Sequence, residues 1–174
     1  MSNSDLRSLI RDVPDFPSPG ILFKDITPLL RDPEAFTAAL DAMKEPWTGS
    51  EIDLVAAIES RGFIFGTGLA ERLNCGLVPV RKPGKLPFST VSWEYDLEYG
   101  TDTLQIHTDA IPSGSRVLIV DDVLATGGTA AAAANLVREV GGTVAGISVL
   151  IELDPLGGRN RLGDLELRSV IRYS

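Results

Sequence analysis

Runs of consecutive apolar residues, two of them followed by a helical pattern, constrain the fold of this chain more than any other feature. LVAAI (54–58), LVPV (77–80) and VLIV (117–120) suit strands that are buried on both faces, because they lack alternating polar residues. Helical patterns follow over 62–73 and 128–140. This alternation of strand and helix predicts an α/β fold, in which helices cover both faces of a parallel sheet.

Further elements extend this pattern. TLQIHTD (103–109) alternates like a strand, and TVAGISVLIEL (143–153) reads as another strand. Asp32, followed by Pro33 and Glu34, is a helix start, and that helix should run to about Glu45. Residues 82–103 are polar and lack a helical period, so they predict a long loop, and loops of this length are usually functional.

The length of 174 residues fits one domain, with a smaller N-terminal subdomain. Apolar residues make up 44% and charged residues 23%, which is ordinary globular usage. The N-terminus lacks the pattern of a secretory signal, and the apolar runs are shorter than a membrane span. We therefore expect a cytoplasmic protein without membrane partners.

Charge and the counts of two residue types exclude several classes of site. The net charge of −8 disfavours nucleic acid as a partner, so any phosphate ligand must be held by a few local cations and amides. Cys75 and His107 are the only residues of their types. No disulfide can form within the chain, and a zinc site built from cysteine and histidine is not available.

One segment, VLIVDDVLATGGT (117–129), carries chemistry. An apolar strand ends in Asp121 and Asp122, and a glycine-containing loop then leads into a helix. Free amides and the helix dipole favour an anion at such a helix start, and adjacent carboxylates can accept hydrogen bonds from ribose hydroxyls. The loop is neither a Walker loop nor a dinucleotide fingerprint. The expected phosphate cradle consists of Ala125, Thr126, Gly127, Gly128 and Thr129.

This segment resembles the 5-phosphoribosyl-1-pyrophosphate (PRPP) motif of the type I phosphoribosyltransferases. FPSPGILFKDITPLL, ESRGFIFG, VRKPGKLP and YDLEYG, in that order along the chain, resemble the adenine phosphoribosyltransferases. The resemblance covers nearly the whole chain. It implies one domain over 1–174 with the type I fold, a central, mostly parallel sheet flanked by helices. It also implies a small N-terminal hood of about 1–35 and a long flexible catalytic loop of about 82–103.

The implied reaction transfers the phosphoribosyl group of PRPP to adenine, giving AMP and pyrophosphate in purine salvage. Asp121 and Asp122 are then expected to bind the ribose hydroxyls, and the cradle to bind the 5-phosphate. The resemblance also implies a non-proline cis peptide near Glu59 and Ser60. The expected pyrophosphate-binding residues are Glu59, Ser60, Arg61, Arg81, Lys82 and Lys85.

The resemblance assigns the remaining roles. Backbone groups of Leu22 and Lys24 are expected to meet the adenine edge, and Phe23 to stack on the ring. Lys24 stands where many members of the family carry arginine. Glu98 matches the catalytic glutamate and Tyr99 a residue that helps to close the loop over the substrates.

Magnesium is the implied cofactor, held mainly by PRPP and water, and no direct protein ligand is assigned. A homodimer is also implied. Two alternatives stay open. One is a phosphoribosyltransferase for another purine or pyrimidine base, which would share residues 117–129 but not the base pocket. The other is a PRPP-sensing regulator without catalytic activity.

Overall fold

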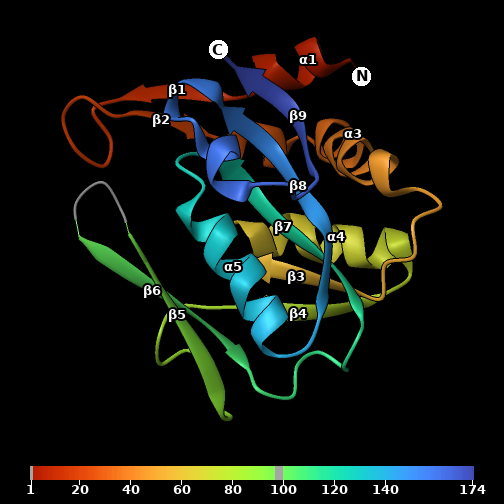
Figure 1. Ribbon diagram of the computed structural model, residues 1–174. Coiled ribbons are helices and arrows are strands. Elements are labelled where there is room, and N and C mark those ends of the chain that lie inside the picture. Colours follow the sequence, from red (N-terminus) through yellow and green to blue (C-terminus); the bar gives the residue numbers. More distant parts are fainter. Residues whose placement is uncertain (1, 97–99) are drawn as a thin grey trace. The chain divides into compact units, whose positions relative to one another are not determined.

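The computed structural model describes residues 2–96 and 100–174, and these form two compact units, Met1–Ala42 and Met43–Ser174 (Figure 1). In the first unit, strands β1 and β2 pair as an antiparallel ribbon, in which Val13 lies opposite Phe23. The side chain of Asp32 accepts hydrogen bonds from the backbone amides of Glu34 and Ala35, which confirms the predicted helix start. The elements of this part are α1 (Asn3–Ser8), β1 (Arg11–Pro14), β2 (Leu22–Asp25), α2 (Thr27–Arg31) and α3 (Pro33–Lys44).

The second unit is built on a parallel sheet with the strand order β4-β3-β7-β8-β9. Its central strand, β7, lies between β3 and β8, so the predicted parallel sheet is confirmed. The main elements are β3 (Leu54–Ile58), α4 (Gly62–Leu73), β4 (Gly76–Val80), β7 (Arg116–Leu124), α5 (Gly128–Glu139), β8 (Thr143–Leu153) and β9 (Leu167–Tyr173). The described residues of this unit also form short 3-10 turns, η1 (Glu45–Trp47), η2 (Asp154–Leu156) and η3 (Gly158–Leu162).

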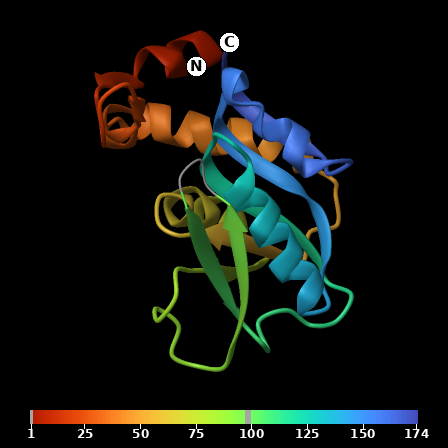
Figure 2. The same ribbon diagram turned by 60° about the vertical axis from the view of Figure 1, so that its left-hand side comes forward.

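Helices α4 and α5 cover opposite faces of this sheet, as Figures 1 and 2 show. The alternation of side chains along β3 explains the arrangement. Ala56 and Ile58 join the apolar cluster that contains the alanine-rich face of α5. Val55 and Ala57 face the other way, toward Gly66 of α4. A strand with helices on both faces needs apolar residues at every position, which is what the run LVAAI supplies.

A separate antiparallel hairpin packs against α5. It consists of β5 (Thr90–Asp96) and β6 (Thr101–His107), and it contributes the buried Leu104 and Ile106 to the apolar cluster. The prediction of one long loop over 82–103 was therefore wrong for 90–96 and 101–103. The residues Val91, Trp93 and Tyr95 alternate with polar ones, and this period of two is the strand signal that the prediction missed.

In the part of the chain that the structure describes, no helix is long and apolar enough to span a membrane.

The close contact between α4 and β3 gives a first prediction. A Cβ atom added at Gly66 would lie 2.5 Å from the Cβ atom of Ala57. Replacing a helical glycine by alanine usually stabilises a protein by about 1 kcal/mol. Here we expect Gly66→Ala to lower the free energy of unfolding by about 1–3 kcal/mol, because α4 must move off the sheet. Urea denaturation would measure this change.

Thr67→Ala is the matched control, since Thr67 is exposed on the same helix. We expect it to change the free energy of unfolding by no more than about 0.5 kcal/mol. If Gly66→Ala proved as stable as this control, the close packing of α4 on β3 would be refuted.

Candidate active site

A pocket of about 330 Å³ lies where the carboxyl ends of β3 and β7 meet. Because these strands are parallel neighbours, the turn after β3 and the loop after β7 open at the same edge of the sheet. The pocket thus joins the predicted phosphate cradle, the acid pair and part of the predicted pyrophosphate site. Its lining consists of Glu59, Ser60, Arg61, Lys82, the run from Asp121 to Gly127, Thr129 and Ala130.

The loop between β7 and α5 has the features of an anion site. Gly127, the residue that precedes α5, has a φ of +82°, which an L side chain rarely adopts. Gly127 has no side chain to cap the start of α5, so within the described residues the first amides of the helix lack this partner and can donate to a ligand. The hydroxyl-bearing residues Thr126 and Thr129 line the pocket beside them. Amides, hydroxyls and the helix dipole together favour a phosphate group here.

The acid pair at the end of β7 is largely removed from solvent. Asp122 is 3% exposed, and its Oδ2 lies 2.8 Å from Nε of Arg61. The backbone amide of Asp122 donates a hydrogen bond of 2.8 Å to Oδ1 of Asp121. Burial and the neighbouring charge of Asp122 raise the pKa of Asp121 well above its usual range. Burial also raises the pKa of Asp122, although Arg61 opposes this rise. A raised pKa means that the ionised carboxylates are disfavoured here, and a ligand that donates hydrogen bonds or carries positive charge would stabilise them.

The turn after β3 is held in place by Glu59. Its carboxylate accepts hydrogen bonds from Nε of Arg81 at 3.1 Å and from the backbone amide of Lys82 at 2.9 Å. Burial raises the pKa of Glu59, but these two donors outweigh burial, so its pKa lies below the usual value. The peptide bond between Glu59 and Ser60 is cis, which confirms that prediction. Because these donors occupy the carboxylate of Glu59, a ligand would contact the backbone of this turn.

Lys82 lines the pocket, and its ammonium belongs to a hydrogen-bond network that the sequence analysis did not predict. Its ammonium donates hydrogen bonds to the hydroxyl of Tyr95, at 3.1 Å, and to the carboxylate of Asp102. Burial lowers the pKa of Lys82, but Asp102 and Tyr95 outweigh burial and raise it. The hydroxyl of Thr129 donates to that of Tyr95 at 3.3 Å, so the network joins the hairpin to the phosphate cradle. Tyr95 lies opposite Asp102 in the hairpin, a pairing that the predicted loop over 82–103 does not contain.

Arg81 and Lys85 do not line this pocket in the part of the chain that the structure describes. The guanidinium of Arg81 lies 5.7 Å from the ring centre of Phe63, and its Nη1 donates to the backbone carbonyl of Lys85 at 3.1 Å. Gly128 begins α5 and is buried. The roles assigned to these residues stay predictions.

The expected adenine-binding residues lie in β2, in the first unit. Rings of Phe16 and Phe23 meet edge to face, with centres 5.0 Å apart. Nζ of Lys24 lies 2.5 Å from Oδ1 of Asp12, so this side chain is engaged in an ion pair. Leu22 is exposed. The ion pair of Lys24 suits a base contact made by its backbone, and all three adenine contacts stay predictions.

Glu98 and Tyr99, the predicted catalytic and loop-closing residues, lie outside the described residues. The flanking residues Asp96 and Thr101 face each other at the end of the hairpin. Within 2–96 and 100–174, no group of three or more histidine, cysteine, aspartate or glutamate side chains could hold a metal ion.

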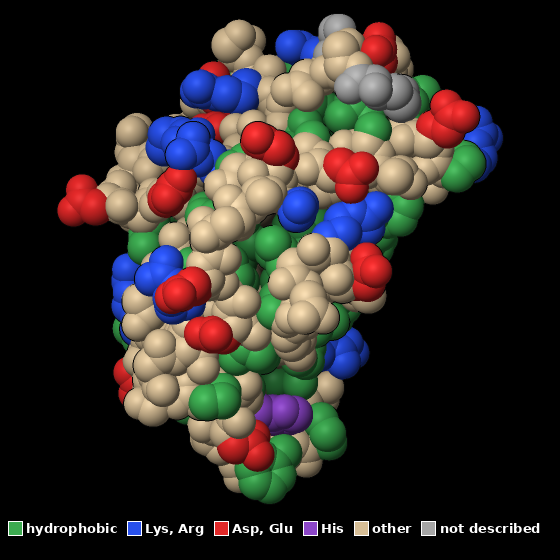
Figure 3. Space-filling view, turned by 90° about the vertical axis from the view of Figure 1, so that its right-hand side faces the viewer, with side chains coloured by type: hydrophobic (Ala, Val, Ile, Leu, Met, Phe, Trp, Pro, Cys, Tyr) green, Lys and Arg blue, Asp and Glu red, His purple; other side chains and the backbone are tan. Residues whose placement is uncertain are grey.

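Basic and acidic side chains are interspersed on the molecular face shown in Figure 3, and the whole chain has a net charge of −8. An anion in this pocket would have to be held by a few oriented groups, such as Arg61, Lys82 and the first amides of α5.

Known proteins share this fold and most of this sequence. The family model for the phosphoribosyl transferase domain matches residues 35–168. The adenine phosphoribosyltransferase of Thermobifida fusca (strain YX) is 62% identical over 161 residues, which cover 92% of each chain. The crystal structure of adenine phosphoribosyltransferase from Thermoanaerobacter pseudethanolicus superposes with a TM-score of 0.97 at 52% identity, covering 99% of this chain and 100% of the other.

A third similar protein carries ligands. It is the adenine phosphoribosyltransferase of Saccharomyces cerevisiae, whose crystal structure is a complex with an imino-altritol bisphosphate and adenine. Its TM-score is 0.91 at 42% identity, and the match covers 97% of each chain.

The acid pair gives a second prediction. A carboxyl group whose pKa is raised on folding reduces stability progressively as the pH rises from its unfolded pKa to its folded pKa. Asp121→Asn removes this penalty, and its amide oxygen can still accept the hydrogen bond from Asp122. We therefore expect the ligand-free variant to gain about 2–4 °C in Tm at pH 7 for each kcal/mol recovered. Differential scanning calorimetry would measure the shift.

Asp122→Asn is the matched control, because it also removes one charge but breaks the ion pair with Arg61. We expect no gain in Tm from this variant. An equal fall in Tm for both variants would show that the two carboxylates do not repel each other in the folded chain.

Proposed function

Because this chain belongs to the phosphoribosyltransferase family, and within it to the adenine phosphoribosyltransferases, we propose that the pocket at the end of β7 binds PRPP for transfer to adenine. The chain is a pentosyltransferase (EC 2.4.2.7) of purine salvage, which converts adenine and PRPP into AMP and pyrophosphate. One observation carries the assignment of the site. The uncapped start of α5, the acid pair and the turn after β3 line a single pocket.

In this proposal the 5-phosphate of PRPP lies against the start of α5. The amides of Gly127, Gly128 and Thr129 and the hydroxyl of Thr126 donate to its oxygens, and Ala125 contributes backbone. Asp121 and Asp122 accept hydrogen bonds from the ribose 2′- and 3′-hydroxyls. The support for this is that both acids line the pocket, Asp122 buried and Asp121 partly buried, where ribose hydroxyls would offset their desolvation.

The leaving pyrophosphate requires cations and oriented amides. Ser60 and Arg61 supply the backbone of the turn, and Lys82 lines the same pocket. Glu59 acts by holding Arg81 and Lys82 in position. We further propose that Arg81 and Lys85 contact the pyrophosphate from outside the described pocket lining.

Magnesium fits this site as a partner of PRPP. Both carboxylates of the acid pair line the pocket, and beyond the ion pair of Asp122 with Arg61 their oxygens can accept hydrogen bonds from waters of a hydrated ion. When bound, the ion neutralises charge on the pyrophosphate that leaves. Asp121 and Asp122 would hold it through water, and no other residue is proposed as a ligand.

In the chemical step, N9 of adenine forms a bond to C1 of the ribose while the bond from C1 to pyrophosphate breaks. We propose that Glu98 lies near N7 of the purine, where its carboxylate supports the proton shift that attack by N9 requires. Leu22 and Lys24 read the base through their backbones, Phe23 stacks on it, and Tyr99 helps to exclude water. We also propose a homodimer located in the cytoplasm, on the strength of the family resemblance.

Two other readings remain as outcomes of experiment. A preference for another base would come from the base pocket, since the acid pair and the cradle are common to the wider family. A regulator without activity would bind PRPP but release no pyrophosphate with any base.

A base panel gives the third prediction. With PRPP and magnesium, we expect kcat/KM for adenine to exceed that for hypoxanthine, guanine, xanthine or orotate by at least about 100-fold, because a site built for specific hydrogen bonds rejects mismatched bases. Release of pyrophosphate measures the rate. Faster turnover of hypoxanthine would refute adenine as the substrate, and absence of turnover with every base would favour the regulator.

The fourth prediction concerns Glu98. We expect Glu98→Ala to lower kcat about 100-fold or more, the range typical of a lost acid-base group, while KM for PRPP changes little. Steady-state kinetics with both substrates would measure the two constants. Glu94→Ala is the matched control, since Glu94 is an exposed acid on β5 of the same hairpin. Equal kcat values for the two variants would remove Glu98 from the mechanism.

A further inference from the structure

A buried carboxylate lies behind the phosphate cradle, on the strand next to β7. Glu152 is only 3% exposed although its side chain is charged. In the register of β7 and β8, Glu152 lies opposite Leu124, the residue that directly precedes the cradle. Buried charges are found in proteins only where they are paired, so the partners of Glu152 indicate what it holds.

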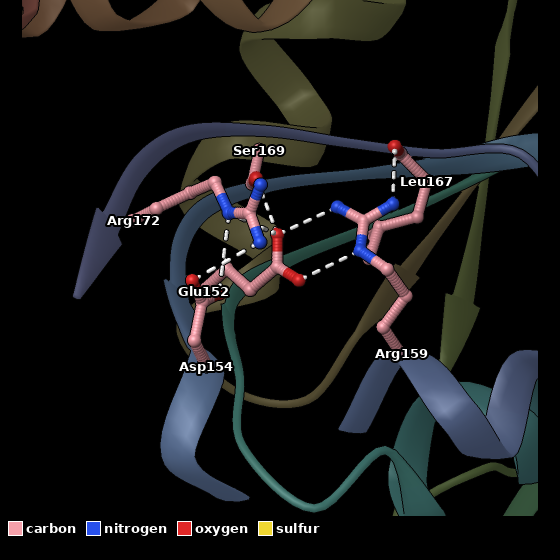
Figure 4. Close-up of polar contacts among 6 residues, drawn as sticks. All are labelled: Glu152, Asp154, Arg159, Leu167, Ser169 and Arg172. Carbon is pink, nitrogen blue, oxygen red and sulfur yellow. Dashed lines mark hydrogen bonds and ion pairs between the residues drawn. The ribbon is translucent and has the colours of Figure 1, made fainter. Parts of the chain in front are cut away.

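Figure 4 shows two arginines approaching Glu152 from opposite sides. Arg159 binds it in bidentate fashion, with Nε 2.9 Å from Oε1 and Nη2 2.7 Å from Oε2. The hydroxyl of Ser169 donates to Oε2 at 2.6 Å, whereas Nε of Arg172 is farther away, at 3.6 Å. Burial raises the pKa of Glu152, but Arg159 and Ser169 outweigh burial and hold it below the usual value. The pair with Arg159 is therefore the strongest contact of this carboxylate.

Arg159 follows Gly158 directly, and Gly158 packs against the cradle, backbone to backbone. A Cβ atom added at Gly158 would lie 2.2 Å from the carbonyl oxygen of Ala125, and one added at Gly127 would lie 2.3 Å from the carbonyl oxygen of Gly158. Only glycine fits at either position. Any shift of Gly158 is therefore transmitted to the backbone of Ala125 and Gly127.

We infer that Glu152 and Arg159 form a positioning pair, which fixes Gly158 against the cradle and thereby sets its affinity for the 5-phosphate. Neither side chain lines the described pocket, so the pair acts through the backbone that it holds. The inference rests on the proposed role of residues 125–129, and it adds two residues that no motif of the family resemblance contains.

Separate binding constants for AMP and pyrophosphate test the inference. AMP carries the 5-phosphate and pyrophosphate does not, so a defect in the cradle weakens the binding of AMP and leaves the binding of pyrophosphate unchanged. We expect Arg159→Ala and Glu152→Gln each to raise the Kd of AMP on the order of 10-fold by calorimetry, and KM for PRPP with it. Kd for pyrophosphate and kcat should stay within about 2-fold, because the cradle binds ground state and transition state alike.

The double variant separates this pair from a direct contact. Since both residues act through one ion pair, the double variant Glu152→Gln with Arg159→Ala should raise the Kd of AMP no more than the single variant with the larger effect. Arg159→Lys should fall between wild type and Arg159→Ala, because an ammonium keeps the charge but loses the bidentate geometry. If Arg159→Ala weakened AMP while Glu152→Gln did not, Arg159 would touch the ligand itself and the inference would fail.

Arg168→Ala is the matched control, because Arg168 pairs with Glu166 on the exposed surface. It should leave the Kd of AMP unchanged. Gly158→Ala tests the same contact independently of charge and should weaken AMP at least as much as Arg159→Ala. A lower Tm with an unchanged Kd of AMP in all of these variants would show a purely structural role and overturn the inference.

Thr126→Val distinguishes failure of the inference from failure of the proposed function. If this variant weakens AMP but the Glu152 and Arg159 variants do not, only the positioning pair is wrong. If Thr126→Val and Gly158→Ala both leave AMP binding unchanged, residues 125–129 do not hold the 5-phosphate, and both proposals fail.

Discussion

The close approach of α4 to the parallel sheet is the constraint on which the pocket depends. A Cβ atom at Gly66 would meet Ala57, and one at Gly62 would lie 2.9 Å from the carbonyl oxygen of Val120. These contacts press the start of α4 against the end of β7. Arg61, the residue before the helix, therefore reaches Asp122, and the turn from Glu59 to Arg61 faces the same space as the acid pair. A helix set farther from the sheet would leave Asp122 buried without its cation.

The pocket concentrates groups whose charges are balanced within the protein. Asp122 is paired with Arg61, and Lys82 with Asp102. The network around Lys82 is only partly buried, so solvent screens it, and a multiply charged pyrophosphate could compete for the ammonium. The acid pair is less fully satisfied, since burial raises the pKa of both carboxyl groups. Carboxyl oxygens that can still accept hydrogen bonds are typical of sites that bind hydroxyls or hydrated cations. A functional site commonly keeps such groups at some cost to the stability of the fold.

Much of the second unit could be predicted from local pattern. LVAAI and TVAGISVLIEL correspond residue for residue to β3 and β8. LVAAI is an unbroken apolar run, as a strand buried on both faces requires. The pocket could be predicted from strand ends, since Asp121 directly follows the apolar run VLIV, and Ser60 and Thr126 lie in the connections that lead from predicted strands to helices. In the hairpin, the predicted strand 103–109 overlaps β6, whereas β5 was not predicted because its polar and aromatic residues resembled a loop. Asp102 and Tyr95 could not be found without it, because their pairing across β5 and β6 is a tertiary fact.

The contacts behind the cradle show why a motif is an incomplete description of a site. Residues 117–129 contain every group expected to touch a phosphorylated ribose, yet their backbone is bounded by Gly158, some thirty positions along the chain. Two glycines in contact allow a close approach of the two backbones but stabilise it little, because neither has a side chain to pack. Neighbouring residues must therefore stabilise the contact. Leu162 packs in the apolar cluster, and Arg159 pairs with Glu152. In the site as we propose it, the backbone at 125–129 recognises the phosphate, and residues of β8 and η3 hold that backbone in place.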